Sequence, residues 1–287
     1  MSLSKAIRLS LIIFFLGSAA GCSMMVSSAT NNLARNLSRS MLNQQDPGTV
    51  KAAIPSYLLL MDALIYDNPE NVSMLRSAAS LNTAYAGLFV ADQQRQKVIA
   101  DKAMDYATRA LCGEAAEACS IRTMPYEQFE KVIAAMDLEQ LPSYYALATS
   151  WAIWVQANSD DWNAVAQLAR IELIMKQVLV LDENYMHGGA HVYLGILATL
   201  LPPAMGGRPD EGKKHFEQAI KISQGKNLMA KVTYAERYAR LMFDRELHDK
   251  LLSETLKAET RQEGLTLMNA IAKQKAEQLL ASADDYF

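Results

Sequence analysis

Apolar residues recur three or four positions apart along most of the chain. Leu168, Ile171, Met175 and Val178 would share one face of a helix, and a similar stripe runs through residues 265–279. The strict alternation of apolar and polar residues that is typical of half-buried strands is essentially absent. The hydrophobic pattern therefore predicts an all-α fold.

Proline, glycine and asparagine divide this pattern into separate helices. Pro55 suits the first turn of a helix over residues 57–66, and Asn68-Pro69 ends that helix. The other helices are expected over residues 71–92, 93–111, 142–154, 163–181, 188–201, 210–223, 232–243 and 246–258, with a last one over the C-terminal stripe.

Short helices joined by short turns suggest stacked helical hairpins, and two stretches have tetratricopeptide character. In the first, Asn68-Pro69 is followed by small residues on two successive helices. In the second, residues 181–185 lead into Leu194-Gly195 and then Phe216. Small residues let helices approach closely and large ones fill the space between them. We expect a TPR-like helical-hairpin solenoid, bundle-like, with a lengthened turn at residues 201–207.

The first 21 residues have the pattern of a secretory signal peptide. Lys5 and Arg8 precede an apolar run over residues 9–16, and small residues follow at 17–21. The apolar run is too short to span a bilayer. Residues 1–21 are therefore interpreted as a leader, residues 22–45 as a tether rich in Ser, Asn, Met and Gln, and residues 46–287 as the helical domain.

Cys22 follows the small residues directly, and Ala19-Ala20-Gly21-Cys22 resembles a bacterial lipobox with Ala19 where leucine is commoner. The resemblance implies that Cys22 carries a diacylglycerol thioether and an N-acyl chain, which together anchor the protein firmly to a membrane. The alternative is an ordinary signal peptide with an incidental cysteine. Ser23 after the cysteine favours, by analogy with lipoprotein sorting, the periplasmic face of the outer membrane over the inner membrane.

Charge and the remaining cysteines narrow the picture further. Removing two of the 28 cations against 31 acidic residues leaves a net charge of −5, which gives no electrostatic basis for binding nucleic acid. Cys112 and Cys119, with six residues between them, are expected to form a structural disulfide in an oxidising compartment. The alternative, a metal pair, would need two further ligands, and no His or other Cys lies nearby in the sequence.

Sequence motifs for catalysis are lacking. The acidic residues are scattered as on any helical surface, no Ser or Cys stands in a nucleophile motif, and no phosphate-binding glycine loop follows a strand. We therefore expect a protein that is not an enzyme and that uses no cofactor.

A series of motifs in a fixed order resembles one family, the T component of tripartite ATP-independent periplasmic (TRAP) transporters, over residues 46–287. The motifs are Asp46-Pro47 with Ala53-Ile54-Pro55, Leu141-Pro142-Ser143-Tyr144-Tyr145 with Trp151-Ala152-Ile153-Trp154, His187-Gly188-Gly189-Ala190-His191, Pro202 with Gly206-Gly207, His215-Phe216 with Ala219, Gly225-Lys226-Asn227, Tyr234-Ala235-Glu236 and the tail from Ala276. The disulfide loop is a departure that the family does not generally require. The resemblance implies a TPR-like periplasmic lipoprotein that forms a homotrimer with a central opening and a hydrophobic cleft in each protomer. It also implies docking of a periplasmic solute-binding protein, the P component.

Several residues are candidates for a ligand site, each beside a simpler structural role. His187 and His191 could share a helix face, but no third ligand for a metal is evident, so a structural or pore-lining role is favoured and no metal is expected. Trp151, Trp154 and Tyr145 could line a cleft for an apolar ligand, although packing is the usual role of such residues.

Two further groups complete the candidate site. Pro202, Gly206 and Gly207 are expected to border the ligand path, or else to form a simple connection. Tyr234 and Arg237 could recognise a carboxylate, the alternative being a solvated helix face. The leading interpretation is a non-enzymatic subunit that handles a hydrophobic or organic-acid ligand during uptake. The alternative is a TPR scaffold for an envelope complex that binds peptide segments.

Overall fold

The computed structural model describes residue 32 and residues 36–287. The predicted leader, Cys22 and most of the predicted tether lie outside the described residues. Within the described part of the tether, residues 36–42 are helical.

Helices follow one another along the whole domain, and the described residues contain no strand. The fold class predicted from the hydrophobic pattern is therefore confirmed. The α-helices are α2 (Pro47–Asp67), α3 (Val72–Phe89), α4 (Gln93–Glu114), α5 (Tyr126–Ala134), α6 (Leu141–Ala157), α7 (Trp162–Val165), α8 (Leu168–Leu181), α9 (Tyr185–Ala198), α10 (Pro209–Ile222), α11 (Leu228–Tyr234), α12 (Arg245–Lys257), α13 (Thr266–Ala281) and α14 (Ala283–Tyr286). Two short 3₁₀ turns, η1 (Ala116–Ala118) and η2 (Pro203–Met205), and a π-helical segment, η3 (Ala235–Ala239), complete the order.

Acidic and amide side chains begin five of these helices. Asp46, Asn71, Asp92, Asp161 and Asp244 each accept a hydrogen bond from a backbone N–H in the first turn of the helix that follows. Such caps satisfy donors that have no partner within the helix, and each one stabilises its helix by about 1 kcal/mol.

Several predicted helix bounds differ from the structure, and one helix was not predicted. α2 begins at Pro47, because the Asp46 cap and a first-turn proline start the helix there, and Pro55 lies within it. The helix predicted over residues 163–181 is divided into α7 and α8. α5 was not predicted, although Phe129, Val132 and Ile133 give it a buried face at helical spacing.

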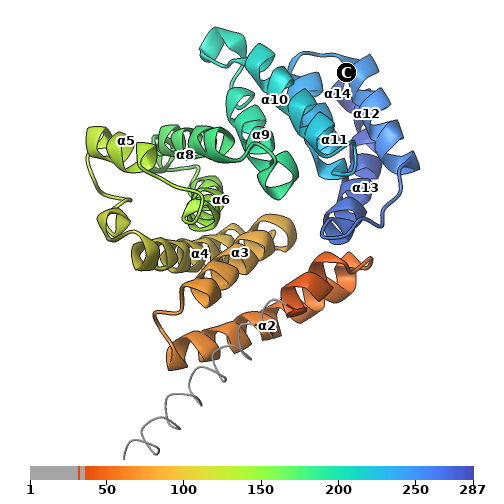
Figure 1. The fold of residues 1–287 in the computed structure, drawn as a ribbon. Coiled ribbons are helices and arrows are strands. Elements are labelled where there is room, and N and C mark those ends of the chain that lie inside the picture. The colour runs from red at the N-terminus through yellow and green to blue at the C-terminus, as the bar shows by residue number, and fades with distance from the viewer. Residues whose placement is uncertain (1–31, 33–35) are drawn as a thin grey trace, which may run out of the picture.

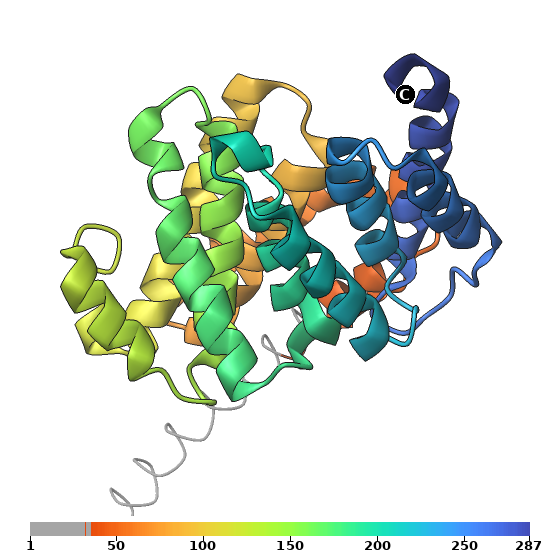
Figure 2. The ribbon, with the colours of Figure 1, turned by 90° about the horizontal axis from the view of Figure 1, so that it is seen from above.

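Neighbouring helices pack as antiparallel hairpins around an arc (Figure 1). α3 packs on α4, α4 on α6, α8 on α9, and α9 on α10. Seen from above, α8, α9 and α10 lie side by side (Figure 2). This succession of hairpins is the solenoid-like arrangement that the sequence predicts.

The two halves of the arc have separate hydrophobic cores. The larger core spans α2 to α9 and contains Trp151 and Phe129, whereas the smaller one joins α10 to α13 around Phe216 and Leu252. The cores meet where Phe216 packs on α9. A Cβ added at Gly195 would lie 2.7 Å from the Phe216 ring, so the absence of a side chain there makes room for the ring.

A third cluster connects the beginning of the domain to its end. Val50, Ile54 and Leu58 of α2 pack with Tyr85 of α3 and Leu267 of α13. α2 thus contacts α13, two elements that are about 200 residues apart in the sequence (Figure 1).

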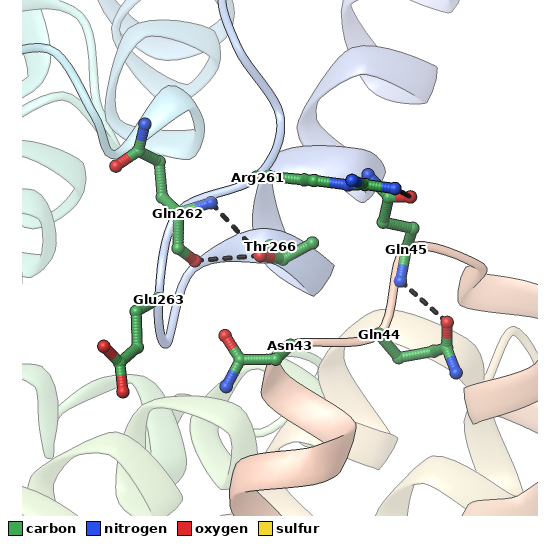
Figure 3. Close-up of a pocket in the computed structure, with 7 residues that line it drawn as sticks. All are labelled: Asn43, Gln44, Gln45, Arg261, Gln262, Glu263 and Thr266. Carbon is green, nitrogen blue, oxygen red and sulfur yellow. Dashed lines mark hydrogen bonds between the residues drawn. The ribbon is translucent and has the colours of Figure 1, made fainter.

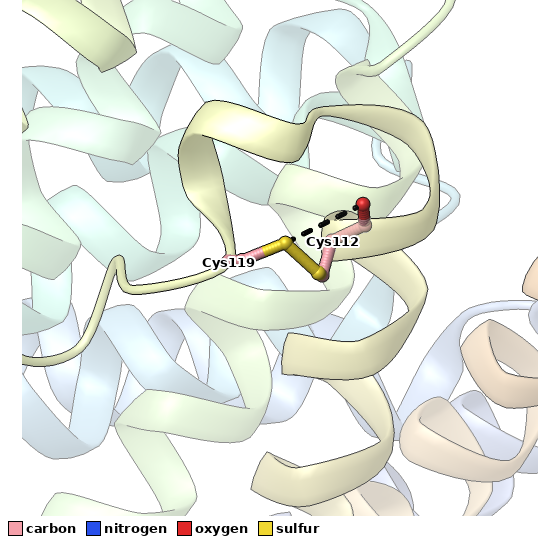
Figure 4. Close-up of a disulfide and its surroundings, with 2 residues drawn as sticks. All are labelled: Cys112 and Cys119. Carbon is pink, nitrogen blue, oxygen red and sulfur yellow. Dashed lines mark hydrogen bonds between the residues drawn. A yellow bond between two sulfur atoms is a disulfide. The ribbon is translucent and has the colours of Figure 1, made fainter.

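Cys112 and Cys119 are joined by a disulfide in the structure (Figure 4). Cys112 lies in the last turn of α4, and Cys119 follows η1 directly. The bond fixes the return of the chain after α4, as a structural staple would.

Candidate functional site

The start of α9 is irregular. Met186, His187 and Gly188 have φ values of 49°, 58° and 75°, which place three successive residues in the left-handed region. Left-handed backbone is unfavourable for residues other than glycine, so contacts from the rest of the fold must hold this turn in place. The regular part of α9 begins only at Gly189.

Three tyrosines gather beside this turn. The ring of Tyr145, from α6, lies edge-on to those of Tyr185 and Tyr193, with centroids 5.2 Å and 6.3 Å away. The Tyr145 hydroxyl occupies the space of a side chain at Gly189, where a Cβ would lie only 2.2 Å from that oxygen. Gly189 is therefore needed for the close approach of α6 to the start of α9. Tyr145, Tyr185 and Tyr193 are called the tyrosine cluster below.

The phenols of the tyrosine cluster are held in their neutral form. Burial raises the pKa of Tyr145 well above its usual range, with smaller contributions from Tyr193 and Tyr185. Burial also raises the pKa of Tyr193 to about 12. All three side chains nevertheless remain half-buried and not fully enclosed. The rings of the cluster are thus partly accessible, whereas the hydroxyls of Tyr145 and Tyr193 lie in a buried environment and stay neutral.

The two histidines of the predicted pair do not act together. His187 is exposed and lies in the left-handed turn, outside the regular helix, so it shares no helix face with His191. His191 is buried, and its ring nitrogens lie 2.8 Å from Nδ1 of His215 and 3.0 Å from Oε1 of Glu183. Burial and the neighbouring His191 lower the pKa of His215. In the part of the chain that the structure describes, no group of three or more His, Cys, Asp or Glu side chains could hold a metal ion.

Trp151 and Trp154 have different surroundings. Trp151 is enclosed in the larger core, where its ring meets that of Phe129 edge-on at 6.3 Å. Trp154 is half-buried, its Nε1 donates a hydrogen bond to Asp101 at 2.6 Å, and the guanidinium of Arg122 lies over its ring. These are packing contacts, and they bring neither tryptophan into the tyrosine cluster.

The turn between α9 and α10 lies on the surface, after the end of α9. Pro202 and Gly206 are exposed. The N–H of Gly207 donates to the Pro202 carbonyl at 3.1 Å, and Gly206 has a φ of 90°. A Cβ at Gly207 would lie 1.7 Å from the Leu201 carbonyl oxygen, so this position requires glycine. The turn is therefore held by its own backbone contacts.

Tyr234 and Arg237 belong to the second half of the arc. Tyr234 is buried, stacks on Phe216 at 5.4 Å, and donates a hydrogen bond to Glu217 at 3.2 Å. Arg237, in the π-helical segment η3, is exposed and lies 4.0 Å from Glu236. The structure therefore does not bring these two residues together with Tyr145.

A second candidate site was not predicted from the sequence. It is a pocket of about 500 Å³ between the segment before α2 and the loop joining α12 to α13 (Figure 3). Its lining consists of polar side chains only: Asn43, Gln44, Gln45, Arg261, Gln262, Glu263 and Thr266. The two walls are also joined directly, since Gln45 accepts a hydrogen bond from Arg261 at 3.0 Å and Asn43 accepts one from the Gly264 N–H at 2.8 Å.

Together, these observations define an all-helical protein of stacked hairpins with a half-buried aromatic surface at a kinked helix. The family model for the TRAP transporter T-component matches residues 43–287, and the chain belongs to this family. Membership associates the protein with a TRAP transport system. A search of curated proteins found no match.

Proposed function

We propose that the protein is a non-enzymatic, lipid-anchored periplasmic subunit of a TRAP-type uptake system. In this role it docks a periplasmic solute-binding protein and handles a hydrophobic or organic-acid ligand. The anchor is the acylated Cys22, which attaches the protein to the periplasmic face of the outer membrane. The observation that carries the proposal is the family match over residues 43–287.

The tyrosine cluster is the surface best suited to the ligand. Its rings offer apolar area that is still partly accessible, and the hydroxyls of Tyr145 and Tyr193 stay protonated at any physiological pH. Sites for small organic ligands are mostly apolar, with a few polar groups that fix the orientation of the ligand. An apolar ligand with one carboxylate matches this combination, since phenol hydroxyls can donate to the carboxylate oxygens.

Binding of a fluorescent apolar anion, 1-anilinonaphthalene-8-sulfonate, tests the assignment of the ligand surface. Tyr145→Ala removes the ring at the centre of the cluster, and Gly189→Ala places a methyl group where the Tyr145 hydroxyl lies. Both variants are expected to weaken binding of the probe at least about tenfold, equivalent to about 1.4 kcal/mol. Tyr126→Ala, on α5, is the matched control. If Tyr145→Ala and Gly189→Ala bind the probe as tightly as the control Tyr126→Ala and the wild-type protein do, the cluster is not the ligand surface.

The partner is tested separately. The lipidated chain is mixed with the solute-binding protein of the same transport system, and the complex is measured by sedimentation velocity. A stable complex is expected with the wild-type chain. If the chain binds no solute-binding protein but captures unfolded peptide segments, the TPR scaffold interpretation replaces this one.

A further inference from the structure

The outer face of α2 is apolar and uncovered. Leu59 and Tyr66 have exposed fractions of 70% and 89%, and Leu60 is 41% exposed. Ala52, Ser56, Leu59, Ala63 and Tyr66 recur every three or four residues, so they form one stripe along the helix. We call these residues, with Leu60, the α2 stripe.

Charged groups lie only at the ends of the α2 stripe. Lys51 lies beside its start, and Asp67, the last residue of the helix, ends it four positions after Ala63 and seven after Leu60. Asp62 lies between them in sequence but turns away, toward Lys102 and the Tyr106 hydroxyl, which donates to it at 2.7 Å. Of the helices that the structure describes, α2 is the one long and apolar enough to cross a membrane, yet only 33% of its apolar window is buried. A helix that is apolar nearly all round normally has every face covered.

The position of α2 in the chain indicates what covers the stripe. Met41, in the helical segment just before α2, packs on the same cluster as Val50 and Ile54, so the chain leaves the described domain beside α2. Thirteen residues separate Cys22 from Asn36. Fully extended, thirteen residues reach about 45 Å at most, so an anchor at Cys22 limits how far the start of the described domain, beside α2, can move from the bilayer.

We propose that the α2 stripe lies on the lipid surface, in the headgroup region of the membrane that holds the anchor. This inference rests on the lipid anchor at Cys22 proposed above. Leucine side chains enter the boundary between headgroups and acyl chains, and an exposed tyrosine suits the same depth because its ring is apolar and its hydroxyl is polar. The contact turns the domain so that α2 faces the bilayer. Helices α3 and α4 then separate α8 from the membrane (Figure 1).

Quenching of tryptophan fluorescence by lipids brominated on their acyl chains tests this orientation. The lipidated full chain is reconstituted in vesicles of phosphatidylethanolamine and phosphatidylglycerol, as Leu59→Trp and, as a matched control, Val180→Trp. Val180, on α8, is 75% exposed, close to the value for Leu59. The signal of the three native tryptophans is subtracted by using the wild-type protein. Brominated lipid is expected to quench Leu59→Trp at least twofold more than Val180→Trp.

Equal quenching of the two reporters would overturn the proposal. Vesicle flotation separates this failure from a failure of the anchor, because an anchored protein floats whichever way it faces, whereas a protein that stays in solution has no anchor and no contact. Sedimentation velocity of the double variant Leu59→Glu, Leu60→Glu tests the alternative that the α2 stripe contacts a second copy of the chain. If this double variant loses self-association that the wild-type protein shows, and Leu59→Trp is not quenched, the stripe binds a second copy and the membrane assignment is wrong.

Discussion

The contact between Gly195 and Phe216 joins the two cores, and a Gly195→Ala substitution tests how tightly they are packed. The new Cβ would lie 2.7, 2.8 and 2.9 Å from three carbons of the Phe216 ring. The ring is fully buried. Overpacking of this kind costs about 1–3 kcal/mol. Alanine in a helix gains up to about 1 kcal/mol over glycine, so with the full gain the net destabilisation is expected to be about 0–2 kcal/mol.

A double-mutant cycle separates the clash from any other effect of the substitution. Phe216→Leu alone removes ring volume and is expected to cost about 1 kcal/mol. In the double variant the shorter side chain leaves room for the methyl group, so the two costs should fall short of additivity by at least about 1 kcal/mol. Urea unfolding followed by circular dichroism, with the disulfide intact, measures all four proteins. Strict additivity would show that the ring does not fill the space above Gly195.

Three further changes test other parts of the structure. Cys112→Ser removes the disulfide, which closes a loop of about eight residues, and is expected to cost about 2–3 kcal/mol in urea unfolding; a variant as stable as the oxidised protein would contradict its role as a staple. Burial lowers the pKa of His215 in the folded protein, whereas the same histidine in the unfolded chain titrates near 6.5. Stability should therefore fall as the pH drops below about 6.5, and the fall should be smaller in His215→Gln; equal pH profiles for both proteins would remove His215 as the cause. Gln224, after α10, has a φ of 52°, so Gln224→Gly should raise stability by about 0.5–1 kcal/mol, and any loss would argue against a strained backbone at this position.

Gly195 and Phe216 were both assigned from the sequence to a repeat pattern in which small residues let helices approach and large ones fill the space, but their contact was not predicted. The start of α9 could not be predicted. No local rule places Met186 and His187 in left-handed backbone. The turn depends on distant partners, such as Ile222, whose side chain lies 3.3 Å from the space of a Cβ at Gly188.

The candidate site was predicted only in part for the same reason. Tyr145 was selected from the sequence, but Tyr185 and Tyr193 were not, because the kink between them changes the helical spacing that a pattern relies on. Trp151 was a reasonable candidate by residue type, but its position in the core depends on α5, a helix that was not predicted. The polar pocket unites residues more than 200 positions apart, and helical periodicity carries no information about such pairings.

The contact of α2 with α13 determines when the domain can finish folding. In the N-to-C order of export α2 emerges before α13, so Ile54 and Leu58 stay without the Leu267 contact until about 200 further residues have followed. Closing so long a loop is entropically costly and slow, so it is expected to be the last step of folding. Until that step, α2 has apolar residues uncovered on two faces. The exported chain is then most vulnerable to aggregation, and a chaperone would act on it mainly in this interval.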